Sequence, residues 1–271
     1  MIPFVKAHAC GNDFLIIEEH LAQRRHADLA RKLCSRNTSV GADGIEFLDR
    51  QNGEFFLRLF NADGSEAELS GNGTRCVAAW LAQSEGLQKV ALGTHGGIRT
   101  CQIIEAIDPS YLIESEMGVP RVMPRTIEIP AVGNTPPLTI PGAMVNVGNP
   151  HFVIMVDTGD FSAHGQTWQD LGARISTSPL FPHGTNVEFV RIVSPAEIEF
   201  RIYERGCGPT TSSGTGTCAA STAAIALHGA NRELTALAEG GIQKVVWPSN
   251  EAIMRLTGPA QIICRGEVSA L

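Results

Sequence analysis

The sequence predicts an α+β protein built from two similar halves, each with one glycine-rich helix start. Two segments about 140 residues apart repeat one pattern, and many short apolar runs are typical of strands. Of the 271 residues, 43% are hydrophobic, 18% are charged and 28 are glycine, which indicates a folded chain with many tight turns.

The repeated pattern joins an aromatic residue to a serine and then to an alanine-rich stretch. The first segment reads FNADGSEAELSGNGTRCVAAWLAQ from Phe60, and the second reads YERGCGPTTSSGTGTCAASTAAIAL from Tyr203. Ser70 opens S-G-N-G-T and Ser213 opens S-G-T-G-T, each ten residues after the aromatic residue. Both segments therefore predict a loop, a turn and a helix.

A serine followed by glycines favours the start of a helix. Serine caps the first turn, and glycines let a ligand approach N–H groups that have no partner within the helix. Two such starts facing each other would form a carboxylate site, whereas two ordinary caps in separate cores are the alternative. Neither segment completes G-x-G-x-x-G or ends in Gly-Lys-Ser/Thr, so nucleotide binding is not expected.

Strands are expected to dominate between these helices. The runs bounded by Gly, Asn and Pro are FLIIEE, EFFLRLF, HFVIMVD, NVEFVRIV and AEIEFRIY. The spacing of Leu21, Leu29 and Leu33 predicts one surface helix from His20 to Arg36, with solvated histidines.

The proline-rich passage from Val119 to Pro141 is expected to break regular structure near the middle of the chain. We place the domain boundary there, with residues 1–118 in the first half and 119–260 in the second. The ligand is expected between the halves.

Charge and cysteine content exclude several classes of protein. A net charge of −7 offers no basic surface for nucleic acid. No run is long and apolar enough to span a membrane, and the N-terminus lacks a signal-peptide core, so we expect a cytoplasmic protein. Seven scattered cysteines without CxxC indicate reduced thiols and no metal site.

Several motifs resemble those of the diaminopimelate epimerase family. They are GNDF at 11–14, GADG at 41–44, FNADGSEAE from Phe60, GNPHFV from Gly148, TNVEF at 185–189 and YERG at 203–206. The resemblance implies two pseudo-symmetric halves, each a curled mixed β-sheet around a central helix, with residues 261–271 returning to the first half. It also implies inversion of an α-carbon by two opposed acid/base groups, without pyridoxal phosphate or metal.

The resemblance further implies a set of contacts to an amino-acid substrate. The side chains that would contact its polar groups are Asn12, Asn61, Asn149, Asn186, Glu204 and Arg205. The backbones that would hold its α-carboxylate are those of Gly71, Asn72, Gly214 and Thr215. For each asparagine alone, closing its own loop turn is the alternative.

Three more residues have open or structural roles. His151, in G-N-P-H, is either a proton shuttle or a satisfied structural histidine. Cys207 precedes the second helix start and is the best substitute for a missing thiol. Cys76 and Cys218 lie well inside the predicted helices and are expected in the core.

Serines stand where the family has its paired catalytic cysteines, so Ser70 and Ser213 occupy the expected acid/base positions. A thiol has a pKa of about 8.5, and a serine hydroxyl is a far weaker acid. Three explanations are open. The serines are engineered, or they are natural and assisted by neighbouring groups, or the chain is a binding protein that has lost the catalytic activity. Cys207-Gly208-Pro209-Thr210 also departs from the family pattern, beside Glu204 and Arg205.

The function expected from these residues is inversion of an amino-acid α-carbon, with LL-diaminopimelate converted to meso-diaminopimelate, at reduced activity. The alternatives are a racemase or tautomerase for another amino or carboxylic acid, and a non-catalytic amino-acid-binding protein. The resemblance suggests a homodimer.

Overall fold

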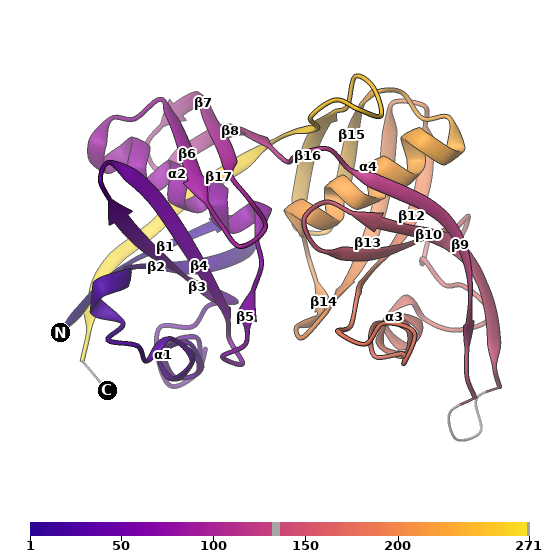
Figure 1. The fold of residues 1–271 in the computed structure, drawn as a ribbon, viewed down its shortest axis with the longest axis horizontal. Coiled ribbons are helices and arrows are strands. Elements are labelled where there is room, and N and C mark those ends of the chain that lie inside the picture. The colour runs from indigo at the N-terminus through magenta and orange to yellow at the C-terminus, as the bar shows by residue number, and fades with distance from the viewer. Residues whose placement is uncertain (132–135, 270–271) are drawn as a thin grey trace. The chain divides into compact units, whose positions relative to one another are not determined.

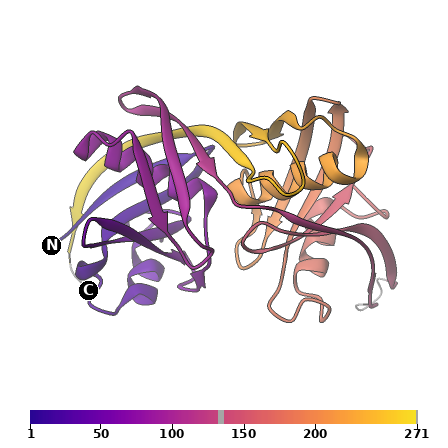
Figure 2. The ribbon, with the colours of Figure 1, turned by 45° about the horizontal axis from the view of Figure 1, so that its top comes forward.

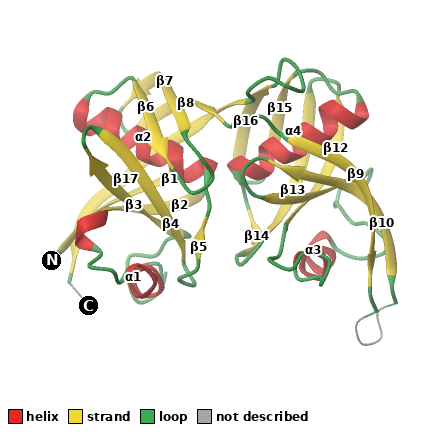
Figure 3. Ribbon diagram, viewed as in Figure 1, coloured by secondary structure: helices red, strands yellow, loops and turns green. Residues whose placement is uncertain are grey.

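A computed structural model describes residues 1–131 and 136–269. The chain forms two compact units, which are considered separately below. Unit one contains Met1–Glu116 and Thr257–Leu271, and unit two contains Met117–Leu256. Strands outnumber helices in both, as the apolar runs predict (Figure 3).

In unit one the strands form a closed ring. Neighbouring strands pair in the order β1, β2, β3, β4, β6, β7, β8 and β17, and β17 pairs again with β1. Their bounds are β1 (Ile2–Ala9), β2 (Asn12–Glu18), β3 (Gly44–Gln51), β4 (Glu54–Asn61), β6 (Lys89–Gly93), β7 (Arg99–Ile107), β8 (Ser110–Glu116) and β17 (Arg255–Val268), with the short β5 (Glu66–Ala67) beside β4. The last strand thus closes the first unit, and Figure 2 shows it beside β1.

The ring encloses the helix α2 (Gly71–Glu85), as Figure 1 shows. Ser70 caps its N-terminus, and Gly86, with φ of 71°, ends it in the left-handed conformation that favours glycine. Cys76, Val77 and Leu81 lie in the core formed by helix and strands. The predicted curled sheet around a central helix is confirmed, as is the buried position of Cys76.

The helix predicted from His20 to Arg36 is wrong in its extent. The structure has a short 3-10 helix, η1 (Glu19–Leu21), and then α1 (His26–Leu33). Gln23 and Arg24 between them have φ of 49° and 62°, which no α-helix can accommodate. The expectation of solvated histidines fails at His26, which is buried and bonded to Glu19 at 2.7 Å.

Unit two has a similar order of strands. Its strands pair in the order β9, β10, β11, β12, β13, β15 and β16, with the short β14 beside β13. Their bounds are β9 (Arg121–Ile129), β10 (Leu138–Asn146), β11 (Pro150–Met155), β12 (Asn186–Ser194), β13 (Glu197–Glu204), β14 (Gly208–Thr210), β15 (Glu233–Ala238) and β16 (Gly241–Val246).

The helix α4 (Gly214–His228) packs in the core of unit two, and α3 (Trp168–Ser176) packs against β12 and β13. Like α2, α4 has 15 residues, a serine cap and a left-handed glycine, Gly229, at its end. Cys218 is fully buried, as predicted. None of the helices in the described residues is long and apolar enough to cross a membrane.

Several strand pairs of the two units correspond. The parallel pairs β2–β3 and β11–β12 correspond, as do the parallel pairs β4–β6 and β13–β15. Each helix follows a short hairpin, β4–β5 in unit one and β13–β14 in unit two. The two helix starts therefore follow corresponding hairpins in the two units.

The proline-rich passage does not break regular structure where the prolines suggested. Pro124 lies inside β9 and Pro141 lies inside β10, and the two strands pair throughout their lengths. Proline is tolerated in a strand where its nitrogen faces away from a hydrogen-bonding partner. The part of the passage at 132–135 lies outside the described residues.

Replacing Leu81 on α2 tests the packing of the helix inside the ring. Leu81 has no exposed surface, so Leu81→Ala should lower the free energy of unfolding by about 2 to 5 kcal/mol through lost burial and a cavity. The exposed Leu180→Ala should change it by less than about 0.5 kcal/mol in the same urea titration. Equal small effects would contradict the packing described here.

Candidate active site

The two serines cap their helices in the same way. Ser70 Oγ accepts a hydrogen bond from the Gly73 N–H at 3.0 Å, and Ser213 Oγ accepts one from the Gly216 N–H at 3.2 Å. Neither helix has an acidic residue in its first turn, so the positive end of each helix dipole stays available to an anion.

In unit two a chain of hydrogen bonds leads away from Ser213. Ser213 Oγ lies 3.4 Å from Thr215 Oγ1, which accepts from Asn149 Nδ2 at 3.4 Å. Asn149 Oδ1 lies 2.8 Å from His151 Nε2, and His151 Nδ1 lies 2.6 Å from Glu188 Oε1. All five residues are buried. The structure therefore brings together four predicted site residues, with Glu188 at the far end.

His151 and Glu188 form a buried hydrogen-bonded dyad. The amide oxygen of Asn149 requires a proton on Nε2, so the second proton lies between Nδ1 and the carboxyl. Burial raises the pKa of Glu188, and the neighbouring His151 opposes that rise. Of the two roles considered for His151, the contacts satisfy the structural one and also connect it to the helix start.

Glu204 is in direct contact with Ser213. Its carboxyl accepts hydrogen bonds from the Thr210 hydroxyl, at 2.6 Å, and from the Ser213 hydroxyl. Burial raises the pKa of Glu204, and these two hydrogen bonds oppose the rise. The carboxyl is thus placed to take or return the Ser213 proton.

Arg205, Asn186 and Cys207 are the other predicted residues of this region. The Asn186 side chain accepts from the Arg205 N–H at 2.9 Å and donates to the Pro150 carbonyl at 3.1 Å. The Arg205 guanidinium donates to the His183 carbonyl at 3.1 Å. Asn186 therefore fixes the turn that carries Arg205, while Cys207 lies exposed two residues further on.

In unit one the helix start is connected through amides. Asn72 Nδ2 donates to Asn12 Oδ1 at 3.2 Å, and Asn12 Nδ2 donates to Asp43 Oδ2 at 2.8 Å. The buried Arg75 holds Asn72 Oδ1 at 2.5 Å and the Gly71 carbonyl at 3.2 Å. Gly71, Asn72 and Asn12 thus lie together beside Ser70.

Asn61 is engaged in its own turn. Its side chain donates to Ser65 Oγ at 3.0 Å, and its backbone N–H donates to the Ser65 carbonyl at 2.9 Å. This is the local role considered as the alternative for a loop asparagine.

A family model described as diaminopimelate epimerase matches residues 4–123 and 143–263. The matched ranges contain both serine helix starts and most of the chain. The chain belongs to the diaminopimelate epimerase family. The recognition based on the sequence motifs is thereby confirmed at the level of the family.

Curated relatives of this family match along nearly their whole length. The chain is 35% identical to the diaminopimelate epimerase of Carboxydothermus hydrogenoformans over 280 residues, covering 97% of this chain and 98% of the relative. It is 36% identical to that of Pelotomaculum thermopropionicum over 281 residues, with 97% and 98% covered. The chain is thus an amino-acid epimerase-like enzyme.

Solved structures share the fold. A probable proline racemase from Agrobacterium radiobacter aligns with a TM-score of 0.76 at 15% identity, covering 99% of this chain and 93% of the other. The agreement at so low an identity confirms the predicted α+β fold class.

Glu46 is a buried carboxyl against the first helix start of this family member. It is the third residue of β3, it is 1% exposed, and its Oε1 has no hydrogen-bond partner. A methyl group on Gly73 would lie 1.9 Å from Oε1, so the carboxyl sits directly against the glycine that Ser70 caps. Burial raises the pKa of Glu46 to about 8.

Sequence reasoning missed both glutamates. The signal was available, because Glu46 and Glu188 each lie between an apolar residue and a phenylalanine, in I-E-F and V-E-F, 142 positions apart. Each is the third residue of its strand and pairs with apolar neighbours: Glu46 with Ile16 and Leu59, and Glu188 with Val153 and Ile202. A carboxyl repeated at an apolar strand position is a stronger signal than either occurrence alone.

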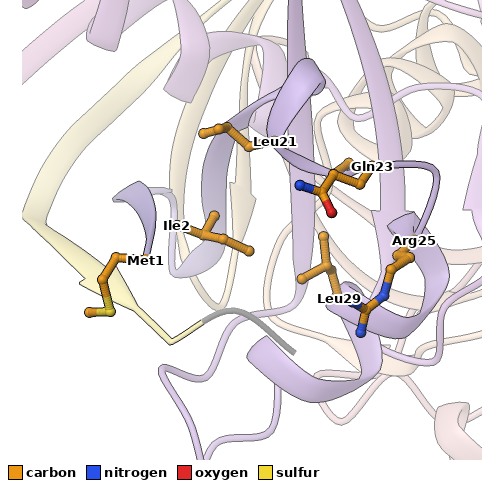
Figure 4. Close-up of a pocket in the computed structure, with 7 residues that line it drawn as sticks. Met1, Ile2, Leu21, Gln23, Arg25 and Leu29 are labelled. Atoms are coloured by element: carbon orange, nitrogen blue, oxygen red, sulfur yellow. The ribbon is translucent and has the colours of Figure 1, made fainter.

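A pocket in unit one contains none of these residues. It is lined by Met1, Ile2, Leu21, Ala22, Gln23, Arg25 and Leu29, with the Leu21, Ile2 and Leu29 side chains around it in Figure 4. Its lining contains no carboxylate and none of the predicted site residues.

Replacing Glu46 with glutamine tests its ionisation. Because the pKa of Glu46 is raised on folding, the folded protein loses stability as pH rises from about 4.5, where the unfolded carboxyl ionises, to about 8. Glu46→Gln should escape this loss, so its advantage over the parent should grow by roughly 1.4 kcal/mol per pH unit across that range.

Urea unfolding at pH 4.5, 6 and 7.5 measures the difference. The exposed Glu54→Gln on β4 is the control and should follow the parent at every pH. If the free energies of unfolding of Glu46→Gln and the parent differ by the same amount at all three pH values, the pKa of Glu46 is not raised on folding.

Proposed function

We propose that this chain inverts the α-carbon of an amino acid, with Ser70 and Ser213 as the two acid/base positions and diaminopimelate as the substrate. The observation that carries the proposal is the matched pair of serine-capped helix starts, one in each unit, within a chain of the diaminopimelate epimerase family. The curated relatives at 35% and 36% identity carry that enzyme's name, which favours the same substrate.

The helix starts suit the carboxylate of an amino acid. The first-turn N–H groups of a helix have no partners within the helix and bear partial positive charge. In our proposal the backbones of Gly71 and Asn72, and of Gly214 and Thr215, hold the α-carboxylate. Asn12, Asn149 and the other predicted polar residues then fix the rest of the molecule.

The chemistry requires help for the serines. A hydroxyl holds its proton far more tightly than a thiol, so an unaided serine would not remove an α-proton at neutral pH. Ser213 has such help, because its hydroxyl donates to Glu204. As Ser213 takes the α-proton, its own proton passes to the carboxylate, and the C–H electron pair remains on carbon.

Substrate recognition at the distal end falls to Arg205 and its surroundings in this proposal. Arg205 is half-buried, and its turn is fixed by Asn186. A guanidinium is well suited to a second carboxylate such as that of diaminopimelate.

The cytoplasm is the proposed location of the reaction, and a homodimer is the proposed assembly.

Restoring cysteines at both positions tests the assignment of the acid/base groups. Ser70→Cys/Ser213→Cys should raise the rate of α-proton exchange in D₂O by about 10² or more, because thiolates replace weak hydroxyl bases. The exchange is followed by NMR for LL-diaminopimelate and a panel of other amino acids, alongside the parent chain.

The outcomes separate three functions. Exchange only with another amino acid would make the chain a racemase for that substrate. Binding of amino acids without exchange, in both the parent and the cysteine variant, would leave a binding protein and overturn the proposal.

A further inference from the structure

Each helix start has a buried glutamate beside it, and the two glutamates occupy corresponding strand positions. Glu46 and Glu188 occupy the third position of the corresponding strands β3 and β12. A methyl group on Gly73 would lie 1.9 Å from Glu46 Oε1, and one on Gly216 would lie 3.1 Å from Glu188 Oε1. Each carboxyl therefore lies near the glycine whose N–H the serine caps.

The two sides differ in what else can hold a proton. Ser213 donates to Glu204, the last residue of β13, and His151 and Glu188 lie further along its chain of hydrogen bonds. The last residue of β4, the strand that corresponds to β13, is Asn61, whose amide cannot hold the proton and donates to Ser65. The acceptor that Ser213 has at this position is therefore missing beside Ser70.

Another carboxyl in reach of this region is already occupied. Asp43 accepts from Asn12 at 2.8 Å and from Arg36 at 2.7 Å, and it is partly exposed. Glu46, by contrast, is buried, and its Oε1 is not engaged by any group in the described residues. A buried carboxyl oxygen without a partner is costly, and a catalytic role is one explanation for such a group in a native structure.

We propose that Glu46 is the proton partner of Ser70, a positioning residue that acts on the reaction through the Ser70 hydroxyl. The inference rests on the proposed function. In this proposal Glu46 exchanges a proton with Ser70, as Glu204 does with Ser213.

The proton transfer is balanced as follows. Glu46 Oε1 lies against Gly73, whose N–H donates to Ser70 Oγ, so the proposed transfer runs between the Ser70 and Glu46 oxygens. As the Ser70 O–H bond breaks and its proton joins the substrate carbanion, the Glu46 O–H bond breaks and its proton joins the Ser70 oxygen. Ser70 ends neutral and Glu46 ends as a carboxylate. The reverse transfer accompanies removal of the α-proton, so no free alkoxide forms in either direction.

Burial supports this role. Since it raises the pKa of Glu46 to about 8, the carboxyl holds its proton near neutral pH and can release it at modest cost. A carboxyl with an ordinary pKa would have no proton to give.

A double-mutant cycle tests the inference. Glu46→Gln removes the acidic carboxyl proton while keeping the shape of the side chain. In the serine chain it should lower kcat for α-proton exchange by about 10² or more with little change in KM. In the Ser70→Cys/Ser213→Cys background the same change should cost less than about threefold, because a thiolate needs no carboxyl partner. The exposed Glu54→Gln should leave the rate unchanged in both backgrounds.

Each result decides the matter. An equal loss in both backgrounds would mean that Glu46 only shapes the helix start, and no loss in the serine chain would mean that it plays no part; either overturns the inference and leaves the proposed function intact. Exchange by the cysteine variant alone would show that Glu46 does not make Ser70 competent. Exchange by neither chain would overturn the proposed function itself.

Discussion

Each unit packs one serine-capped helix in its core, and the positions of the other site residues depend on this packing. In unit one the closed ring of strands buries α2 from Gly71 onward, so the first turn is held by contacts on several sides. Ser70 and Ser213 are fixed by the N–H groups of their own first turns. A side chain held in this way presents its oxygen at the positive end of a helix, where an anion is favoured.

The two units use the same frame with different polar residues. In unit two, Ser213, Thr215, Asn149, His151 and Glu188 form a connected buried network, and Glu204 adds a second carboxyl. In unit one the hydrogen bonds connect Asn72, Asn12 and the ion-paired Asp43. The Oε1 atom of the buried Glu46 has no hydrogen-bond partner among the described residues. A reaction that removes a proton with one group and returns one with another can use such unequal halves, because each side must handle its own proton.

The parts of the fold carried by local signals could be predicted from sequence. Serine followed by glycine marked both helix starts, and the apolar runs marked the strands, because caps and strand patterns depend on neighbouring residues alone. The helix from His20 to Arg36 failed because its break at Gln23 and Arg24 has no signature in those residue types. Pro124 was misjudged because its tolerance depends on which side of β9 its nitrogen faces, which only the pairing determines.

The candidate site was predictable only in part for the same reason. Ser70, Ser213, His151 and the asparagines were found from repeated or recognisable motifs. Which of them touch one another follows from strand register, as when β11 beside β12 brings the His151 and Glu188 side chains together. Glu46 was missed because an acidic residue in an apolar run ordinarily signals solvent exposure, whereas here it faces the buried glycine of a helix.

The central claim is that two separate groups, one in each unit, act on one α-carbon. The most direct measurement is the placement of deuterium at early times when LL-diaminopimelate turns over in D₂O. Two groups predict deuterium at the inverted carbon of the product, while the unreacted substrate keeps its proton, because the proton removed by one group is not the one returned by the other. Deuterium appearing equally in substrate and product from the first turnovers would indicate a single group that exchanges with solvent, and would contradict the account.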